Sequence, residues 1–223
     1  MKPIISAQKL CKTYGRKSTE FQALKNINLK INPGETVAIL GKSGSGKSTL
    51  MHLLALLDQP TSGRIQINGT DSTRLKSSQL NKIRNHNFGF VFQQFFMNPS
   101  DTVLDNVLLP LKIAGTHRRD RKQLAMAALK TVELDDKAHN KANDLSGGQK
   151  QRVCIARAIV NHPKVIFADE PTGNLDSATG AKIEELLFNL NQEKDVTLII
   201  VTHDEELANK CQRQIHIKDG ELQ

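Results

Sequence analysis

Residues 37–48 read VAILGKSGSGKS, and this stretch decides the fold class. Residues 37–40 form a short apolar run, typical of a buried strand, and residues 48–57 have a pattern typical of a helix. Glycines and serines fill the turn between them, where backbone N–H groups can turn inward around an anion. A strand, a glycine-rich turn and a helix in this order predict a phosphate-binding loop.

The loop matches the pattern G-x-x-x-x-G-K-[ST] at every fixed position. In such a loop we expect Lys47 to contact the β- and γ-phosphates of ATP and the hydroxyl of Ser48 to bind Mg²⁺. The alternative, a turn that binds nothing, is disfavoured by the strand before it and the helix after it. The residues expected to bind nucleotide here are Gly41, Ser43, Gly44, Ser45, Gly46, Lys47, Ser48 and Thr49.

Two more apolar runs predict strands of the same sheet. Residues 165–168 and 196–201 are continuous and rich in β-branched side chains, as in a parallel sheet covered on both faces. Between them, apolar residues at positions 183, 186, 187 and 190 predict an amphipathic helix. The alternation of strands and helices favours a doubly wound α/β domain.

Polar residues follow both of these strands. Asp169 and Glu170 end the first, and His203 comes after the second. Carboxyl ends of adjacent parallel strands line the ligand crevice of an α/β sheet. We therefore expect Asp169 to organise Mg²⁺, Glu170 to act as a base toward water, and His203 to reach a γ-phosphate. Taken alone, the two carboxylates fit equally well as caps of the helix expected near Ser177.

The expected edges of the domain differ from this core. Apolar and polar residues alternate over 27–31 and 65–67, which indicates half-exposed antiparallel strands. Residues 103–141 have a helical pattern, with breaks expected at Gly115 and at 135–136.

Length and composition limit the class of protein. The 223 residues suffice for one large α/β domain. No run approaches the roughly 20 apolar residues that cross a bilayer, and the first residues lack the apolar core of a secretion signal. We expect one domain over 1–223, with a helical subdomain at about 95–160 inserted in the catalytic core.

The formal net charge is +8, and basic residues are densest at 117–122. This segment fits a solvated helix surface, an anionic membrane surface or nucleic acid. No aromatic residues interleave with these charges, so no nucleic-acid partner is expected. Cys11, Cys154 and Cys211 are far apart in the sequence and form no CxxC pair, so we expect them to be reduced and structural.

With its motifs in this order, the chain resembles the ATP-binding subunits of ABC transporters over essentially its whole length. Residues 144–149 read DLSGGQ and match the signature motif of that family, and residues 174–176 read NLD and match its D-loop. The resemblance implies an ABC-type P-loop ATPase: a RecA-like core with a mixed or parallel sheet, an N-terminal antiparallel β subdomain and an inserted α-helical subdomain.

The resemblance also implies further site residues. Tyr14 matches the aromatic residue that stacks on adenine, Gln93 the Q-loop glutamine, and His203 the switch histidine. Ser146 and Gly148 would contact ATP held by a second copy of the chain. The implied set comprises Glu170, His203, Lys47 and Gln93 for catalysis; the loop residues with Tyr14, Ser146, Gly147, Gly148, Gln149 and Asp176 for the nucleotide; and Ser48, Gln93 and Asp169 for Mg²⁺.

Three stretches, at 56–63, 89–93 and 168–176, resemble the subgroup that serves MacB, the lipoprotein-releasing LolCDE complex and FtsEX. This implies an ATP-dependent homodimer on the cytoplasmic face of the cell membrane, bound to an integral membrane permease near residues 93–97. The expected function is ATP-driven export or extraction. The alternatives are an FtsE-like subunit that pulls on its partner without transport, and a soluble non-transport ABC ATPase.

Five of the eight phenylalanines fall within residues 88–96. Those at positions 88, 90 and 92 alternate with two other residues, which predicts that they form one buried face of a strand. Residues 95–97, Phe-Phe-Met, come where a loop begins. They fit either a groove for a short helix of the membrane subunit or a small satellite core.

Overall fold

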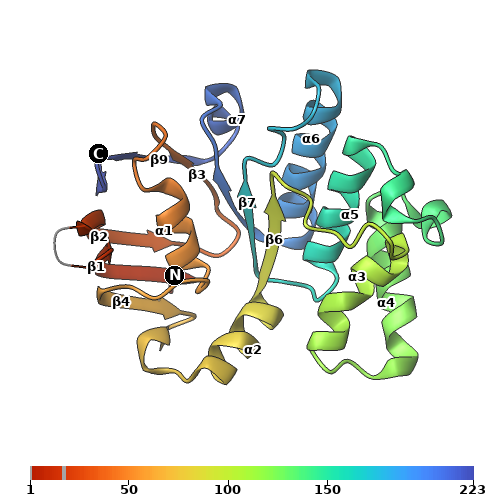
Figure 1. Ribbon diagram of the computed structural model, residues 1–223, viewed down its shortest axis with the longest axis horizontal. Helices are drawn as coiled ribbons and strands as arrows, with labels where there is room; N and C mark the ends of the chain where they lie inside the picture. Colours follow the sequence, from red (N-terminus) through yellow and green to blue (C-terminus); the bar gives the residue numbers. More distant parts are fainter. Residues whose placement is uncertain (1, 17–18) are drawn as a thin grey trace. The chain divides into compact units, whose positions relative to one another are not determined.

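The computed structural model describes residues 2–16 and 19–223. The chain divides into two compact units, Met1–Asn81 with Thr197–Gln223 and Lys82–Val196, and each is described by itself (Figure 1). Among the helices in the described part of the chain, none is both long and apolar enough to span a bilayer.

The first unit contains an antiparallel sheet with the strand order β2-β1-β4-β5. Its strands are β1 (Ile5–Tyr14), β2 (Phe21–Ile31), β4 (Ser62–Ile67) and β5 (Thr70–Asp71). In β2, Ile27, Leu29 and Ile31 are buried and the residues between them are exposed. The expectation of half-exposed antiparallel strands is therefore confirmed, and β1, which the sequence pattern did not reveal, pairs with both β2 and β4.

The same unit holds a second set of strands in the order β10-β9-β3-β8. The elements are β3 (Thr36–Leu40), α1 (Lys47–Leu54), β8 (Thr197–Val201), α7 (Glu205–Asn209), β9 (Arg213–Lys218), β10 (Glu221–Leu222) and a short 3-10 helix (Ser72–Arg74). β3 runs parallel to β8 and β9, and every residue of β3 and β8 is buried. The strands predicted from the apolar runs at 37–40 and 196–201 are therefore confirmed as buried strands of the core.

The second unit packs helices against two parallel strands, β6 (Phe88–Phe92) and β7 (Val165–Asp169). Its helices are α3 (Val103–Ile113), α4 (Arg118–Thr131), α5 (Gly147–Ile159) and α6 (Ser177–Lys194), with 3-10 turns at Asp135–Lys137 and Ala142–Asp144. Helix α2 (Ser77–Asn87) runs across the boundary of the two units in the sequence. This unit extends beyond both ends of the helical subdomain predicted at about 95–160, and it includes β6 and β7 as well as helices. The bounds of the helical subdomain therefore stay a prediction.

Strand β6 departs from one sequence prediction. Phe88 is buried, but Phe90 and Phe92 are only half-buried, although their rings stack at a centroid distance of 5.8 Å. On the opposite face Gly89 is buried, and a Cβ there would come within 2.5 Å of the carbonyl oxygen of Ala158 in α5. The prediction that all three phenylalanines are buried is wrong, because the closest helix packs on the glycine face.

Candidate functional site

The loop between β3 and α1 is held in place by neighbouring backbone. The N–H of Ser45 donates to the carbonyl of Lys42 at 3.1 Å, and the N–H of Gly220 donates to the carbonyl of Ser45 at 3.0 Å. Gly46, which precedes α1, has a φ of 108°, and a Cβ there would meet the carbonyl oxygen of Ala23 at 2.7 Å. Only glycine fits this position, so the shape of the loop is fixed by β2 and by the β9–β10 hairpin.

Three features of this loop fit the triphosphate of ATP. The Nζ of Lys47 lies across the loop and donates to the carbonyls of Gly41 at 2.7 Å and Lys42 at 3.1 Å. The hydroxyl of Ser45 is buried and has no hydrogen-bond partner within residues 2–16 and 19–223. Helix α1 begins at Lys47, so its positive N-terminal end faces the loop. A cation, a helix N-terminus and an unused hydroxyl favour a phosphate anion.

His203 lies at the same edge of the first unit as this loop. Ile39 and Val201 are register partners in the parallel strands β3 and β8. Gly41 comes two residues after Ile39, and His203 comes two residues after Val201. Both residues therefore lie just beyond the carboxyl ends of these neighbouring strands. The N–H of Thr202 donates to the carbonyl of Ile39 at 3.2 Å, which extends the pairing to that edge.

Tyr14 ends β1, and the residue is 40% exposed. Partial burial and then the hydrogen bond to Asp58 raise the pKa of Tyr14, while the side chain of Thr49 opposes this shift. Thr49 belongs to α1, directly after the glycine loop. Within the first unit, the structure therefore places Tyr14 beside Thr49 at the end of the loop, and His203 at the strand edge where the loop begins.

The second unit carries the carboxylates and the Q-loop glutamine. Phe92 and Asp169 are register partners in the parallel strands β6 and β7. Gln93 and Glu170 are the next residues after the two strands, so they follow the same edge of the sheet. Glu170 has a φ of 46°, in the left-handed region, although Pro171 follows it. Strained backbone of this kind gathers at functional positions, where the surrounding structure holds a side chain in one direction.

Gln93 is tied to the D-loop of the same unit. Its Nε2 donates to Oδ1 of Asn174 at 3.2 Å, and Nδ2 of Asn174 donates to the carbonyl of Gln93 at 2.8 Å. A Cβ on Gly173 would meet Nε2 of Gln93 at 2.9 Å, so the close approach needs glycine there. This two-way contact fixes the Q-loop glutamine beside the loop that follows Glu170.

Asp176 caps helix α6. Its Oδ1 accepts a hydrogen bond from the N–H of Thr179 at 3.0 Å. The side-chain hydrogen bond from Thr179 is the first cause that lowers the pKa of Asp176. Asp176 thus takes the capping role that Asp169 and Glu170 were considered for, and that alternative for the two carboxylates is wrong.

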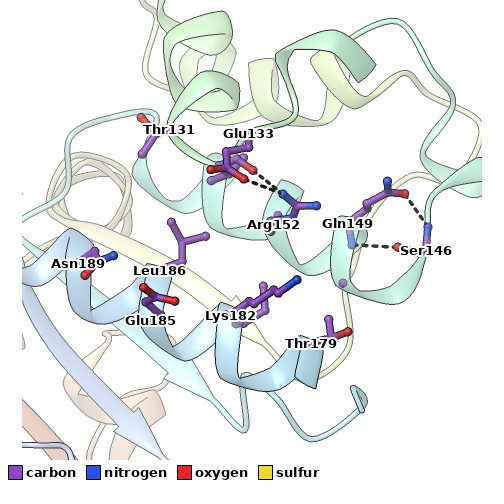
Figure 2. A pocket seen from close by; sticks show the side chains of 13 residues that line it. Thr131, Glu133, Ser146, Gln149, Arg152, Thr179, Lys182, Glu185, Leu186 and Asn189 are labelled. Atoms are coloured by element: carbon purple, nitrogen blue, oxygen red, sulfur yellow. Dashed lines mark hydrogen bonds and ion pairs between the residues drawn. The ribbon is translucent and has the colours of Figure 1, made fainter. Parts of the chain in front are cut away.

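The signature motif begins helix α5 with a capping box. The Ser146 hydroxyl accepts from the N–H of Gln149 at 3.3 Å, and Oε1 of Gln149 accepts from the N–H of Ser146 at 3.0 Å. Figure 2 shows these residues at the rim of a groove of about 600 Å³ that lies between α5, α6 and the end of α4. Arg152, paired with Glu133 at 3.7 Å, and Lys182 also line this groove.

The sequence motifs gave no sign of one buried residue that contacts the segments carrying Gln93 and Glu170. Gln151 in α5 is 1% exposed, and its Nε2 donates to the carbonyls of Phe92 at 3.3 Å and Pro171 at 2.6 Å. These carbonyls belong to the residues next to Gln93 and Glu170. The only sequence signal was a glutamine on the otherwise apolar, buried face of this helix.

We expect Gln151→Leu to slow hydrolysis as well as to destabilise the fold. Two carbonyls lose their donor, at a cost of about 1–3 kcal/mol of unfolding free energy. A shift of about 1 Å at Glu170 would lower kcat on the order of 10- to 100-fold. Denaturant unfolding and single-turnover ATP hydrolysis measure the two effects.

The matched control is Asn161→Leu, since Asn161 donates to the carbonyls of Asn85 and Pro110, away from the motifs. It should lose similar stability and keep its kcat. Equal kcat losses in both variants would show that Gln151 has only a structural role.

A family model described as "ABC transporter" matches residues 24–173. The chain is 45% identical over 222 residues to the lipoprotein-releasing system ATP-binding protein LolD of Geobacter metallireducens, covering 100% of this chain and 99% of that protein. It is also 43% identical to the macrolide export ATP-binding/permease protein MacB of Syntrophobacter fumaroxidans, over 99% of this chain and 31% of that protein.

Among solved structures, the dimeric ABC transporter cassette MJ0796 has a TM-score of 0.89 and 46% identity, over 98% of this chain and 96% of that one. The ABC transporter ATP-binding protein MJ0796 of Methanocaldococcus jannaschii is 47% identical to this chain over 227 residues. A second dimeric structure of MJ0796 is a post-hydrolysis state with ADP and Pi, also at a TM-score of 0.89.

The chain therefore belongs to the ABC transporter family, as an ATP-binding and ATP-hydrolysing subunit. The expected ABC-type α/β fold is confirmed, with its antiparallel N-terminal sheet. The roles of individual site residues, and the combination of the first unit's loop with the second unit's carboxylates, stay predictions.

Proposed function

We propose that this chain is the ATPase subunit of a membrane transport complex, in which two copies close on ATP and drive a separate permease. The observation that carries the proposal is the N-terminus of α5, where the Ser146–Gln149 capping box stands at the rim of an open groove. One chain thus offers both a phosphate-binding loop and a second, separate anion-facing helix end.

In the proposed dimer, each nucleotide lies between two chains. The loop around Lys47 of one chain holds the phosphates, and Ser146 with Gly148 of the other chain contacts the γ-phosphate. Tyr14 stacks on the adenine ring. Hydrolysis is then cooperative, because neither chain completes a site alone. The dimeric MJ0796 structures support this arrangement by similarity.

The hydrolysis step needs groups in three roles. Glu170 accepts a proton from the attacking water, Gln93 orients that water and His203 reaches the γ-phosphate. When Mg²⁺ is bound, it neutralises charge on the β- and γ-phosphates, and Ser48, Asp169 and Gln93 would hold it. A hydroxyl, a carboxylate and an amide oxygen are hard oxygen ligands, which fit this ion.

The proposed permease contact is the loop after β6. Phe96 is 66% exposed with a φ of 42°, and its ring meets Phe92 edge-on at 5.5 Å. With Phe95, Met97 and Lys150, Phe96 lines a shallow pocket of about 240 Å³. An exposed phenylalanine above such a pocket favours a partner surface over a satellite core.

Phe96→Ser should therefore release the chain from membranes while leaving ATP binding intact. Loss of one buried phenylalanine contact corresponds to about 1.5–3 kcal/mol, or roughly 10- to 100-fold in partner affinity. The membrane-bound fraction and the Kd for ATP measure the two effects. The control is Leu109→Ser, which removes another half-exposed apolar side chain. A comparable loss of ATP binding or of Tm in Phe96→Ser would favour the satellite core.

We propose export or extraction as the direction of transport, because the similar proteins are named for lipoprotein release and macrolide export. The chain would then lie on the cytoplasmic face of the cell membrane, held there by its permease.

The test is affinity capture of tagged Glu170→Gln chain, with ATP, from gently solubilised membranes, followed by mass spectrometry. Lys47→Ala chain without ATP serves as the control. A partner with few membrane spans and a large extracytoplasmic domain supports the proposal. A many-span permease would contradict the direction of transport, and a soluble partner would contradict the membrane role.

A further inference from the structure

The exposed ring of Tyr14 is held at two points, by Lys12 and Asp58, to which the sequence motifs assigned no role in nucleotide binding. Its hydroxyl donates to Oδ2 of Asp58 at 2.9 Å. The Nζ of Lys12 lies 4.7 Å from the centroid of the ring, in cation–π geometry. All three residues belong to the first unit, in β1 and in the turn after α1.

Lys12 and Asp58 also hold each other. The Nζ of Lys12 donates to Oδ1 of Asp58 at 2.8 Å and to the carbonyl of Gln59 at 2.7 Å, and it lies 2.8 Å from Oδ2 of Asp58. The Lys12 side chain is only 12% exposed, against 33% for that of Asp58. Partial burial opposes ionisation of Asp58, but the hydrogen bonds from Lys12, Gln59 and Tyr14 outweigh it and lower the pKa.

We propose that Lys12 and Asp58 form a positioning pair that holds the Tyr14 ring as a flat platform for the base of the nucleotide. This inference rests on the proposed role of Tyr14 in ATP binding. Lys12 covers one face of the ring, and a base stacks on the remaining exposed surface. A ring that is already fixed loses less conformational entropy when the base binds.

The pair should therefore affect binding of the base and have no effect on binding of the phosphates. We expect Asp58→Asn and Lys12→Met each to raise KM for ATP by roughly 3- to 10-fold, with kcat changed by less than about 2-fold. Inorganic tripolyphosphate, which has no base, should inhibit all variants with the same Ki as the unaltered chain. Lys12→Arg keeps the cation and should restore most of the affinity.

Two matched controls separate this effect from a general loss of charge. Asp71→Asn removes another carboxylate of the first unit, which pairs with Arg74 at 3.5 Å. Lys25→Met removes a lysine of β2 that pairs with Glu221 at 3.8 Å. Both should leave KM for ATP unchanged within about 2-fold, because exposed ion pairs contribute little.

A double-mutant cycle tests whether Asp58 acts through the Tyr14 hydroxyl. Tyr14→Phe keeps the ring and loses only the hydrogen bond, so it should raise KM for ATP as Asp58→Asn does. The double variant should then bind ATP no worse than either single variant, within about 2-fold. Additive losses would overturn the proposed contact.

Tyr14 also provides an optical signal of its own, because the chain has one tyrosine and no tryptophan. A spectrophotometric titration therefore reports Tyr14 alone. We expect its pKa above 10.0 in the unaltered chain, lower in Asp58→Asn and higher in Lys12→Met, since Asp58 raises it and Lys12 lowers it. Opposite shifts would confirm that both residues contact Tyr14 in solution, while the KM and tripolyphosphate measurements test the positioning role.

The outcomes distinguish this inference from the proposed function. If the unaltered chain neither binds nor hydrolyses ATP, the proposed function fails. If it hydrolyses ATP and the Asp58 and Lys12 variants keep its KM, only the positioning pair is wrong. Parallel losses for ATP and tripolyphosphate would equally overturn it, because they would show damage to the whole site.

Discussion

Glu170→Gln is expected to bind ATP with a Kd within about 3-fold of the unaltered chain and to lose at least about 100-fold in kcat. The amide keeps the size and hydrogen-bonding reach of the carboxylate but cannot accept the proton of water. A 100-fold loss corresponds to about 2.7 kcal/mol of transition-state stabilisation. Because ATP then persists, the variant should accumulate as a dimer when ATP and Mg²⁺ are present.

Phosphate release and size-exclusion chromatography with and without ATP measure these two effects. Glu193→Gln is a suitable control, since it removes an exposed carboxylate near the end of α6 that belongs to none of the motifs. Turnover at a normal rate in Glu170→Gln would rule out Glu170 as the base. A variant that neither hydrolyses nor binds ATP would instead show that the substitution had disrupted the local structure around Glu170.

Lys47→Ala should fail one step earlier, at nucleotide binding. Its ammonium bridges the loop carbonyls of Gly41 and Lys42, where it supports the loop and lies at the proposed phosphate site. Removing one partner of a buried charged contact costs on the order of 2–5 kcal/mol, or roughly 30- to 3,000-fold in Kd. Isothermal titration calorimetry with ATP measures the loss.

Lys42→Ala is the control for this prediction, because it removes an exposed cation from the same loop and leaves its backbone carbonyl in place. We expect less than about a 3-fold change in Kd. If Lys47→Ala keeps its affinity for ATP and loses only kcat, the lysine acts on the transition state alone.

The core of the fold was predictable because its signals are local. Strands β3, β7 and β8 are continuous apolar runs, and α6 repeats apolar residues at helical spacing. The glycine loop combines a strand, a turn and a helix in consecutive residues. Each of these patterns is set by neighbours in sequence, so no knowledge of tertiary contacts was needed.

Residues that act through distant partners were not predictable in the same way. Gln151 reaches carbonyls 59 and 20 residues away, and Lys12 reaches Asp58 across 46 residues. Polar side chains of this kind look like ordinary solvated residues in a sequence. Only the folded backbone shows that one of them is buried and that the other lies over an aromatic ring.

Helix α5 (Gly147–Ile159) joins two regions that are proposed to contact other chains. At its start, Ser146 stands where a second chain's nucleotide is proposed to bind. Near its end, Arg157 donates to the carbonyls of Phe96 at 2.8 Å and Phe95 at 3.0 Å. Ser146 and Arg157 are eleven positions apart, which corresponds to a rise of about 16 Å along the helix. Because α5 is one continuous helix, a displacement at the proposed permease contact would be transmitted along it to the proposed nucleotide contact.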